Sequence, residues 1–375
     1  MFDSLDDRPR LDRESCRKRQ RRLLERMQQL GVDRAIVTSD ENVHYLTGLA
    51  PRRLIPAAAA LDVDGHCTLC TTSDAIHDSL AADDVVVYEA QWHATLRQER
   101  RCLTMQELAR SLDARRSRRI GIEFSQCAGQ SLGGLPSGEA AVDLDPVMWS
   151  LRRRKDSDEL AMILHAVRCT ERMYEVAREI IEPGICELEV YGRLNAAAVE
   201  SAGEPLTGFG NDFQCGSIGG PPRRRAAQAG ELYILDLGPA YRGYYADTCR
   251  TFAVDGRPTD AQLRAWEAVV SVLQLVEDSV RPGVSCRGIF ETARNRLDAH
   301  LPGGFIHHLG HGFGLEPHEA PHLNPHWDDV VEEGDVLTAE PGLYAESLKA
   351  GLRLEQNYRV TAGGVERLTS FPLEL

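Results

Sequence analysis

Two aspartates in the second half of the chain lie in apolar surroundings. Asp236 stands in YILDLG and Asp247 in YYADTCRTF, with Gly238 and Gly243 in the segment between them. The glycines predict a hairpin that brings the two carboxylates across from each other on adjacent strands. Carboxylates held that close repel each other, so either one stays protonated or a cation lies between them. The pair therefore indicates a divalent-cation site or, alternatively, two unrelated aspartates at strand ends.

A stretch rich in histidine and glycine follows further along the chain. GFIHHLGHGFGLEPHEAPHLNPHW holds half of the chain's twelve histidines, and glycines alternate at 310, 312 and 314. Alternate glycines let the backbone or a ligand approach closely beside His311. The spacing is neither that of a zinc finger nor HExxH. Because neutral imidazole is the commonest nitrogen ligand and acid–base group, the stretch predicts metal binding or proton transfer here.

Two glutamates near the end of the chain lie in apolar, strand-like runs. Glu340 stands in VLTAEPGLY and Glu355 in GLRLEQNYRV, with Arg353 on the same strand face. A glutamate flanked by apolar residues needs a partner, and Arg353 could supply one as a plain ion pair. Together with the two aspartates and His311, however, the glutamates make a set of four carboxylates and one imidazole. Such a set suits two ions of Mn²⁺, Fe²⁺, Co²⁺ or Zn²⁺ better than one structural Zn²⁺.

The elements that must position these residues are helices and antiparallel strands in the second half. A capping box of Asp156 and Glu159 opens a long helix that ends before Pro183. Further helices are expected at 186–201, from Thr259 to Val280 and from Ser285 to His300. Strand-like runs lie between and after the helices, with no regular strand–helix alternation. This pattern predicts an α+β fold for the second half.

The first half predicts a smaller α/β unit. An amphipathic helix over 13–30 stops at Gly31, and short apolar runs at 35–39, 56–61, 67–71 and 84–88 alternate with polar segments. A shift from apolar to densely charged sequence near residue 150 predicts a boundary there. We therefore expect two domains, residues 1–150 and 151–375.

Composition narrows the class of partner. The net charge of −14 argues against nucleic acid and anionic membrane surfaces. Neither a membrane-spanning apolar run nor the apolar core of a secretion signal is visible, so we expect a cytoplasmic protein with reduced cysteines. Cys67 and Cys70 form a lone CxxC, which is a weak signal for structural zinc or redox chemistry.

In this order and context, these motifs resemble a known family. LDLG, ADTCRTF, HHLGHGFGLEPHE, AEPGLY and GLRLEQ are similar to the creatinase/aminopeptidase P/methionine aminopeptidase superfamily, the pita-bread metallopeptidases of family M24. NVHYLTG in the first half is similar to a motif of the creatinase-type N-terminal domain. Within the superfamily the chain looks most like prolidase and Xaa-Pro aminopeptidase. The resemblance implies a C-terminal pita-bread domain after a smaller creatinase-type domain, and a homodimer.

The resemblance implies a dinuclear metal centre and a role for each ligand. Asp236 would chelate one ion, Asp247 and Glu355 would bridge both, and His311 and Glu340 would complete the coordination of the second ion. Manganese is the first choice for the two divalent ions, with cobalt, zinc and iron as alternatives.

The resemblance also implies the reaction. A hydroxide that bridges the metals would attack the amide bond before proline in a short peptide, as in an Xaa-Pro dipeptidase or aminopeptidase. Glu340 would orient the hydroxide, His307 and His318 would hydrogen-bond the substrate and the tetrahedral intermediate, and Arg353 would meet a substrate carboxylate or Glu355.

One feature departs from the family pattern. A further histidine is usual just upstream of the first metal aspartate, but GSIGGPPRRRAAQAGEL contains none. One hypothesis is that Arg223, Arg224 or Arg225 binds a substrate carboxylate instead; the alternative is a solvated basic turn. The departure keeps open a hydrolase of a different C–N substrate, as in creatinase, or a catalytically altered metal-binding relative. A non-catalytic binding module is the third possibility, although such proteins usually lose metal ligands.

Overall fold

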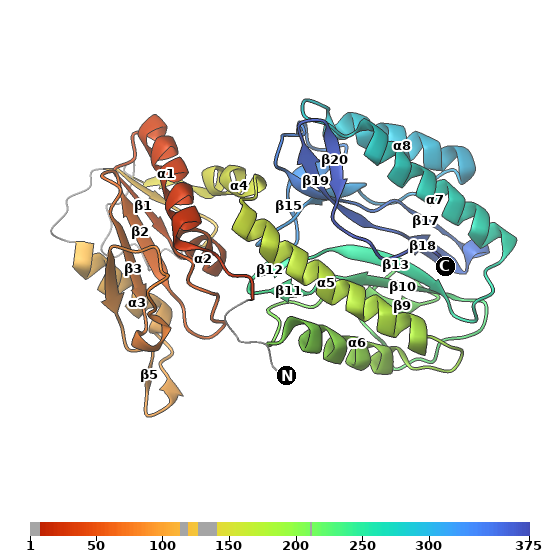
Figure 1. The fold of residues 1–375 in the computed structure, drawn as a ribbon, viewed down its shortest axis with the longest axis horizontal. Helices are drawn as coiled ribbons and strands as arrows, with labels where there is room; N and C mark the ends of the chain where they lie inside the picture. The colour runs from red at the N-terminus through yellow and green to blue at the C-terminus, as the bar shows by residue number, and fades with distance from the viewer. Residues whose placement is uncertain (1–7, 113–118, 127–140, 211) are drawn as a thin grey trace. The chain divides into compact units, whose positions relative to one another are not determined.

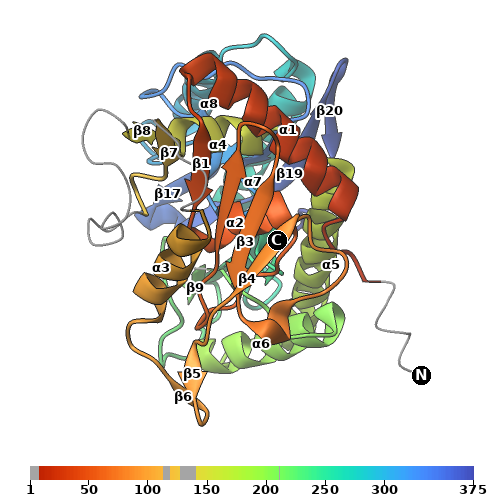
Figure 2. The same ribbon diagram turned by 90° about the vertical axis from the view of Figure 1, so that its left-hand side faces the viewer.

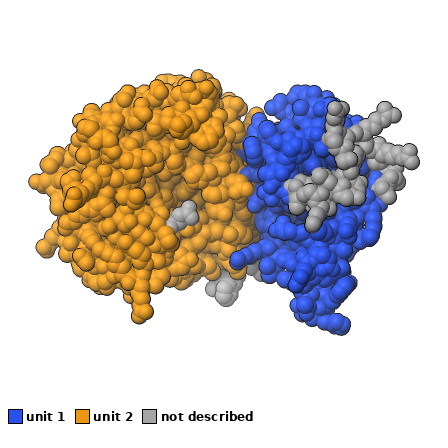
Figure 3. Space-filling model, turned by 180° about the vertical axis from the view of Figure 1, so that it is seen from behind, with its two compact units in different colours: residues 1–152 blue, residues 153–375 orange. Residues whose placement is uncertain are grey.

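The structure is a computed structural model that describes residues 8–112, 119–126, 141–210 and 212–375. The chain divides into two compact units, residues 1–152 and 153–375 (Figure 3). The boundary predicted near residue 150 lies within the last helix of the first unit, α4 (Asp145–Arg153). Among the described residues, no helix has the length and apolar character needed to cross a membrane.

The first unit is built on a mixed six-stranded sheet. Its strand order is β4-β3-β2-β1-β7-β8, and Figure 2 shows β3 and β4 side by side. Helix α3 packs on β2, β3 and β4 through one apolar cluster. The elements of this unit before α4 are α1 (Arg13–Leu30), β1 (Arg34–Val37), α2 (Asp40–Thr47), β2 (Ala58–Asp62), β3 (Cys67–Thr71), the 3-10 helix η1 (Ser73–Ala75), β4 (Asp84–Val87), β5 (Gln91–Trp92), β6 (Thr95–Leu96), α3 (Arg100–Leu112), β7 (Ile120–Ile122) and β8 (Ala141–Asp143).

Local sequence explains where the first helix begins and ends. The Asp12 side chain accepts a hydrogen bond from the Ser15 backbone N–H at 2.8 Å, which caps the first turn. Gly31 ends the helix with a φ of 64°, a left-handed conformation that glycine adopts without steric cost. The helix predicted over residues 13–30 is confirmed.

The second unit places two helix pairs outside several antiparallel sheets. Figure 1 shows α5 and α6 on one side of the strands, and α7 and α8 on the other. Its elements are α5 (Ser157–Ile180), α6 (Glu187–Ala202), β9 (Asp212–Cys215), β10 (Leu232–Leu237), β11 (Ala240–Tyr241), β12 (Tyr244–Tyr245), β13 (Thr248–Ala253), α7 (Asp260–Ser279), α8 (Cys286–His300), β14 (Gly310–Gly312), β15 (Glu319–Leu323), β16 (Val336–Ala339), β17 (Gly342–Ala345), η3 (Glu346–Leu348), β18 (Ala350–Arg353), β19 (Gln356–Thr361) and β20 (Gly364–Arg367).

Each helix pair covers a different sheet. α5 and α6 pack on the three-stranded sheet β13-β10-β9 through one apolar cluster. α7 and α8 pack on the five-stranded sheet β15-β14-β16-β19-β20 and on the hairpin β17-β18 through another. The capping boxes at Asp156–Glu159 and Thr259–Gln262 are both formed, as predicted. The predicted α+β architecture is confirmed.

The loops between strands are more irregular than the sequence predicted. VLTAEPGLY does not form one strand, because Glu340 separates β16 from β17. Likewise Glu355 separates β18 from β19, so the prediction of continuous strands through the two glutamates is wrong. The Glu340 N–H donates to the Leu309 carbonyl at 2.7 Å and the Glu355 N–H to the Cys249 carbonyl at 2.9 Å. These bonds fix both glutamates to neighbouring chain segments at the points where the strands break.

Candidate metal centre

The five predicted metal ligands converge, although they come from five separate segments of the second unit. Asp236 lies in β10, Asp247 directly precedes β13, His311 lies in β14, and Glu340 and Glu355 occupy the two strand breaks. His311 Nε2 is 3.3 Å from Glu340 Oε1 and 3.6 Å from Asp247 Oδ2. One ligand atom each of Asp247, His311 and Glu355 lies within 4.8 Å of the others. The fold therefore brings together side chains that are far apart in the sequence.

A cavity of about 490 Å³ gives access to this cluster. Asp236, Asp247, His311 and Glu340 line it. Glu355 lies behind them with only 1% of its surface exposed. The four lining residues can therefore meet a ligand directly, while the fifth carboxylate is held deep in the unit.

The two aspartates approach each other diagonally. In the β10–β13 register Asp236 pairs with Cys249. The prediction that Asp247 lies directly across from Asp236 is therefore wrong by two residues of register. The segment between them forms the small hairpin β11-β12, whose turn residues Arg242 and Gly243 have φ angles of 49° and 91°. Two successive positive φ angles match the strand twist of a tight hairpin. The predicted hairpin therefore exists, with a diagonal placement of the two carboxylates.

Glu355 tests whether these residues fit a cation. Both of its carboxylate oxygens are buried and have no hydrogen-bond partner among the described residues. Burial, followed by the negative charges of Asp247, Glu340 and Asp236, raises the pKa of Glu355 well above its usual range. A buried carboxylate without a partner is costly, and a cation between it and Asp247 removes that cost. The donor set therefore fits divalent ions.

The other carboxylates show the same crowding. Burial raises the pKa of Asp236 to about 6, although the positive charge of Arg353 opposes this shift. Burial and the charge of Asp236 raise the pKa of Asp247 well above its usual range. Burial also opposes ionisation of Glu340, but hydrogen bonding to His311 and the neighbouring imidazoles outweigh it, so the pKa of Glu340 is lowered. Only Glu340 thus has positive partners that compensate for its burial.

His311 presents one nitrogen to the carboxylates. Its Nδ1 donates to the Gly312 carbonyl at 3.0 Å, which leaves Nε2 facing Glu340 and Asp247. Burial lowers the pKa of His311, but Glu340 and Asp247 outweigh it and raise the value to about 9. A carbonyl on the far nitrogen is the usual way in which a metal-binding imidazole is oriented.

The glycines beside His311 allow close packing of backbone. A Cβ at Gly310 would overlap the Thr338 carbonyl, and one at Gly312 would overlap the Ala320 carbonyl. β14 therefore packs its backbone tightly against neighbouring strands, as the alternate glycines predicted.

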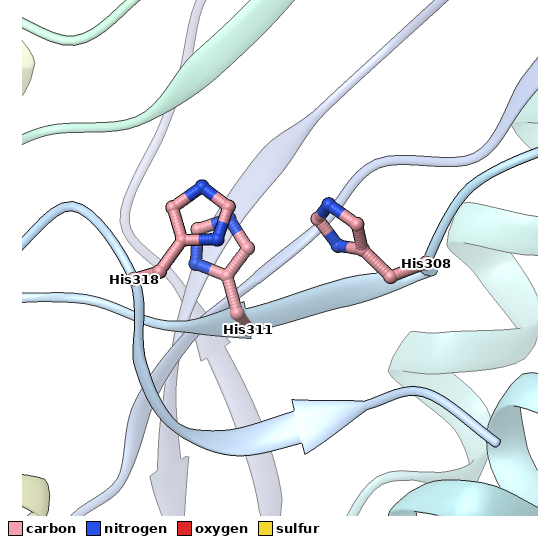
Figure 4. Close-up of side chains that lie close together, drawn as sticks. All are labelled: His308, His311 and His318. Atoms are coloured by element: carbon pink, nitrogen blue, oxygen red, sulfur yellow. The ribbon is translucent and has the colours of Figure 1, made fainter. Parts of the chain in front are cut away.

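His307 and His318 both line the cavity beside the cluster of predicted ligands. The His318 ring stacks on the His311 ring at 3.7 Å, and its exposed side chain lines the cavity (Figure 4). His307 Nδ1 donates to the His308 carbonyl at 2.7 Å, so Nε2 accepts from the Tyr344 hydroxyl at 3.0 Å. Burial lowers the pKa of both His307 and His318 to about 4, so both rings are neutral at pH 7.

His308 was not assigned a role from the sequence, yet it belongs to the same cluster. Its Nδ1 is 3.4 Å from Glu340 Oε1, and it lines the cavity. Figure 4 shows its ring near those of His311 and His318. The doubled histidine in HHLGHG was the signal that could have indicated it.

Arg353 pairs with aspartates rather than with Glu355. Its Nη2 donates to Asp236 Oδ2 at 2.7 Å and also to Asp212 Oδ2, while Nη1 donates to the Tyr344 hydroxyl at 2.9 Å. The alternative of an ion pair between Arg353 and Glu355 is therefore not borne out, because Arg353 bonds the two aspartates and the Glu355 oxygens have no hydrogen-bond partner among the described residues. Neither Tyr344 nor Asp212 carried a signal strong enough to be singled out from the sequence.

The arginines upstream of Asp236 do not face the cavity. Arg223 pairs with Glu187 at 2.6 Å and Arg225 with Glu231 at 2.5 Å. Arg224 is exposed and is absent from the cavity lining. The hypothesis that one of these arginines binds a substrate carboxylate is not supported by this conformation.

The lone CxxC shows no sign of a metal site. Cys67 and Cys70 are both buried as free thiols in β3, and burial raises the pKa of each to about 12. Within the part of the chain that the structure describes, neither cysteine joins a group of side chains that could hold a metal. Both thiols therefore behave as core residues.

Comparison with known proteins links both halves of the chain to described families. A family model described as "Metallopeptidase family M24" matches residues 161–362, and one described as "Creatinase/Prolidase N-terminal domain" matches residues 19–153. The chain is 26% identical to an Xaa-Pro dipeptidase of Pyrococcus horikoshii over 361 residues, covering 95% of this chain and 97% of that protein. An Xaa-Pro dipeptidase of Pyrococcus furiosus is also 26% identical, over 96% of this chain and 99% of its own length.

Solved structures share the fold. The prolidase of Pyrococcus horikoshii matches with a TM-score of 0.81 at 24% identity, over 96% of this chain and 99% of its own. The His361Ala form of Escherichia coli aminopeptidase P matches with a TM-score of 0.79 at 20% identity, over 96% of both chains. At these identities the likeness shows the fold alone.

Proposed function

The chain belongs to metallopeptidase family M24, and from that premise we propose that it is a dinuclear-metal hydrolase that cleaves the amide bond before proline in short peptides. The observation that carries the proposal is the buried Glu355, whose oxygens find no hydrogen-bond partner in the described part of the chain and which lies beside Asp247 and His311. The Xaa-Pro dipeptidases to which the chain is similar over nearly its whole length support the proline-directed substrate.

The metal-binding roles in this proposal are those that the family resemblance implies, and the convergence of the five side chains supports them. Asp236 would hold one ion, Asp247 and Glu355 would bridge two, and His311 and Glu340 would complete the second site. Such a pair of ions supplies Lewis acidity and an activated water when bound. Oxygen-rich coordination with one imidazole favours manganese, with cobalt, zinc and iron as alternatives.

The remaining residues would handle the substrate and its protons. Glu340 lies between His311 and His308 and is well placed to take a proton from the attacking water. His318, neutral and exposed to the cavity, would hydrogen-bond the substrate carbonyl as negative charge develops on it. His307 is held by Tyr344 and the His308 carbonyl, so it must exchange one of these partners to contact the substrate.

A panel of substrates tests the proposal. Purified protein is analysed for bound metal and then assayed with Ala-Pro, Gly-Pro, an Xaa-Pro tripeptide, Ala-Ala and creatine. Turnover of the proline dipeptides alone identifies a dipeptidase, and turnover of the tripeptide identifies an aminopeptidase. Tight metal binding without cleavage of any proline peptide would contradict the proposal.

The missing histidine upstream of Asp236 is the reason to test a second class of substrate, a C–N substrate such as creatine. The segment upstream of Asp236, where the family usually carries a histidine, contributes Ile218 to the cavity and no imidazole. Loss of a polar substrate contact favours an altered substrate, and for this reason creatine is included in the panel. A homodimer and a cytoplasmic location also remain proposals, and sedimentation and cell fractionation test them.

A further inference from the structure

Asp212 stands next to the candidate metal centre without being one of its ligands. It begins β9 and is paired in register with Asp236 on β10. Arg353 Nη2 lies between the two carboxylates and donates to Oδ2 of each. Asp212 does not line the cavity, so it acts through Arg353 and not on a ligand directly.

Two negative charges, those of Asp212 and Asp236, face the one positive charge of Arg353. Arg353 is 7% exposed, so its positive charge is poorly screened by water. An uncompensated guanidinium against Asp236 would neutralise that carboxylate and repel a divalent cation nearby. Asp212 supplies the second negative charge, which leaves Asp236 available to a cation while Arg353 still fixes its orientation.

Asp212 also organises the turn that faces the cavity. Its Oδ1 accepts the Gly220 N–H at 2.6 Å. Gly219 has a φ of 138°, and a Cβ there would overlap the Asp212 carboxylate. The turn is therefore folded onto Asp212, with Ile218, 54% exposed, lining the cavity next to it.

We propose that Asp212 is a positioning residue that balances the charge of Arg353 and thereby holds Asp236 in its metal-binding state, and that the Gly219–Gly220 turn depends on the same carboxylate. This inference rests on the proposed metal centre. Because partners of metal ligands are commonly worth 10- to 100-fold in metal affinity, the effect is large enough to measure.

The test is the affinity of the full chain for Mn²⁺, measured by calorimetry after removal of bound metal. Asp212→Asn keeps the shape and an acceptor for Gly220 N–H but removes the charge, so its Kd is expected to rise about 10- to 100-fold. At saturating Mn²⁺ its KM for Ala-Pro is expected to stay within about twofold, because the turn keeps its hydrogen bond.

Glu204→Gln is the matched control. Glu204 also pairs with an arginine, Arg242, at 2.7 Å, with a similarly exposed side chain (20% against 19% for Asp212), and does not line the cavity. This variant removes one negative charge without touching Arg353, and its Mn²⁺ affinity is expected to match the parent. An equal loss of affinity in both variants would show a general charge effect and overturn the inference.

A second variant approaches the same carboxylate from the turn. Gly219→Ala places a methyl group where the Asp212 carboxylate lies, so it is expected to weaken Mn²⁺ binding as Asp212→Asn does. Unchanged Mn²⁺ affinity in either variant overturns the part of the inference that it tests. Failure of the parent to bind Mn²⁺ would instead contradict the metal centre itself, and parental Mn²⁺ binding without peptide cleavage would contradict only the proposed substrate.

Discussion

At the scale of single residues, the site is a cluster of acids that the protein alone does not stabilise. Neither Glu355 oxygen has a hydrogen-bond partner within the ranges that the structure describes, and burial together with neighbouring charges raises the pKa of Asp247 and of Glu355. Each of these features costs free energy in the metal-free protein, and the binding of the proposed cations would remove that cost. Metal binding and stability of the second unit are therefore coupled.

Replacing Glu355 tests this coupling. Glu355→Gln removes the charge that would bridge two ions but keeps the size of the side chain, so kcat/KM is expected to fall by about 100-fold or more. The parent should gain about 2.7 kcal/mol of stability at a metal concentration near 100 times Kd, and the variant much less. Thermal unfolding with and without Mn²⁺ measures the difference. An equal gain in parent and variant would contradict a ligand role for Glu355.

Metal binding should release protons. In the metal-free protein the pKa of Asp236 is about 6 and that of His311 about 9, while those of Asp247 and Glu355 are raised well above their usual range. At neutral pH a metal must therefore displace protons from His311, Asp247 and Glu355, and near pH 6 from Asp236 as well, so the apparent Kd for Mn²⁺ falls as pH rises from about 6 to about 9. Calorimetry in two buffers with different ionisation enthalpies measures the protons released. Identical heats in both buffers would contradict the prediction.

Residue types and order were enough to predict that these five side chains converge, because an acidic group in an apolar segment needs a partner. The partners of those ligands could not be predicted in the same way. Asp212 meets Arg353 across 141 positions of sequence, and nothing in GFGNDFQC marks the contact. Such pairings depend on strand register, which a single sequence does not determine.

At the scale of elements, β14 controls where His311 lies. A carbonyl group occupies the space that a side chain would need at each of its two glycines. At Gly310 it is the carbonyl of Thr338, and at Gly312 that of Ala320. A methyl group at Gly312 would push β14 away from β15 and move His311 with it. The tight strand packing is thus part of the metal site's geometry.

Gly312→Ala is therefore expected to be costly. Overpacking of this kind lowers the free energy of unfolding by about 1–3 kcal/mol, and the displaced His311 should also weaken Mn²⁺ binding. Gly363→Ala is the control, because a Cβ at Gly363 meets nothing within 4 Å and its effect should stay within about 0.5 kcal/mol. Thermal unfolding and Mn²⁺ titration compare the two variants. Parental stability and Mn²⁺ affinity in Gly312→Ala would contradict the prediction, because they would show that β14 accommodates the methyl group without displacing His311.

Helices were easier to predict than the strands that carry the site. Capping boxes and apolar periodicity gave the starts of α5 and α7, since both signals are local. The break at Glu340 carried a local signal that the strand prediction overlooked, because Pro341–Gly342 is a turn-type pair and proline is rare inside a central strand, whereas the break at Glu355 carries none. The breaks arise from backbone bonds to Leu309 and Cys249, which are distant in sequence.

At the scale of the whole molecule, all proposed metal ligands and the residues around them belong to residues 153–375. This unit has two apolar clusters of its own, one under each helix pair. A unit with its own core and a complete ligand set can in principle fold and bind metal by itself. The sequence predicted a division near residue 150, close to the boundary between these two units.

A fragment of residues 153–375 tests that division. If the unit is self-sufficient, the fragment should fold cooperatively and bind Mn²⁺ with a Kd within about threefold of the full chain, a difference of about 0.7 kcal/mol. The measurement is calorimetric titration of both proteins, with the Glu355→Gln form of the fragment as the non-binding control. Peptide cleavage is measured separately, because substrate contacts can come from outside the metal-binding unit. A fragment that folds but binds Mn²⁺ more than about tenfold more weakly would show that the first 152 residues take part in building the metal centre.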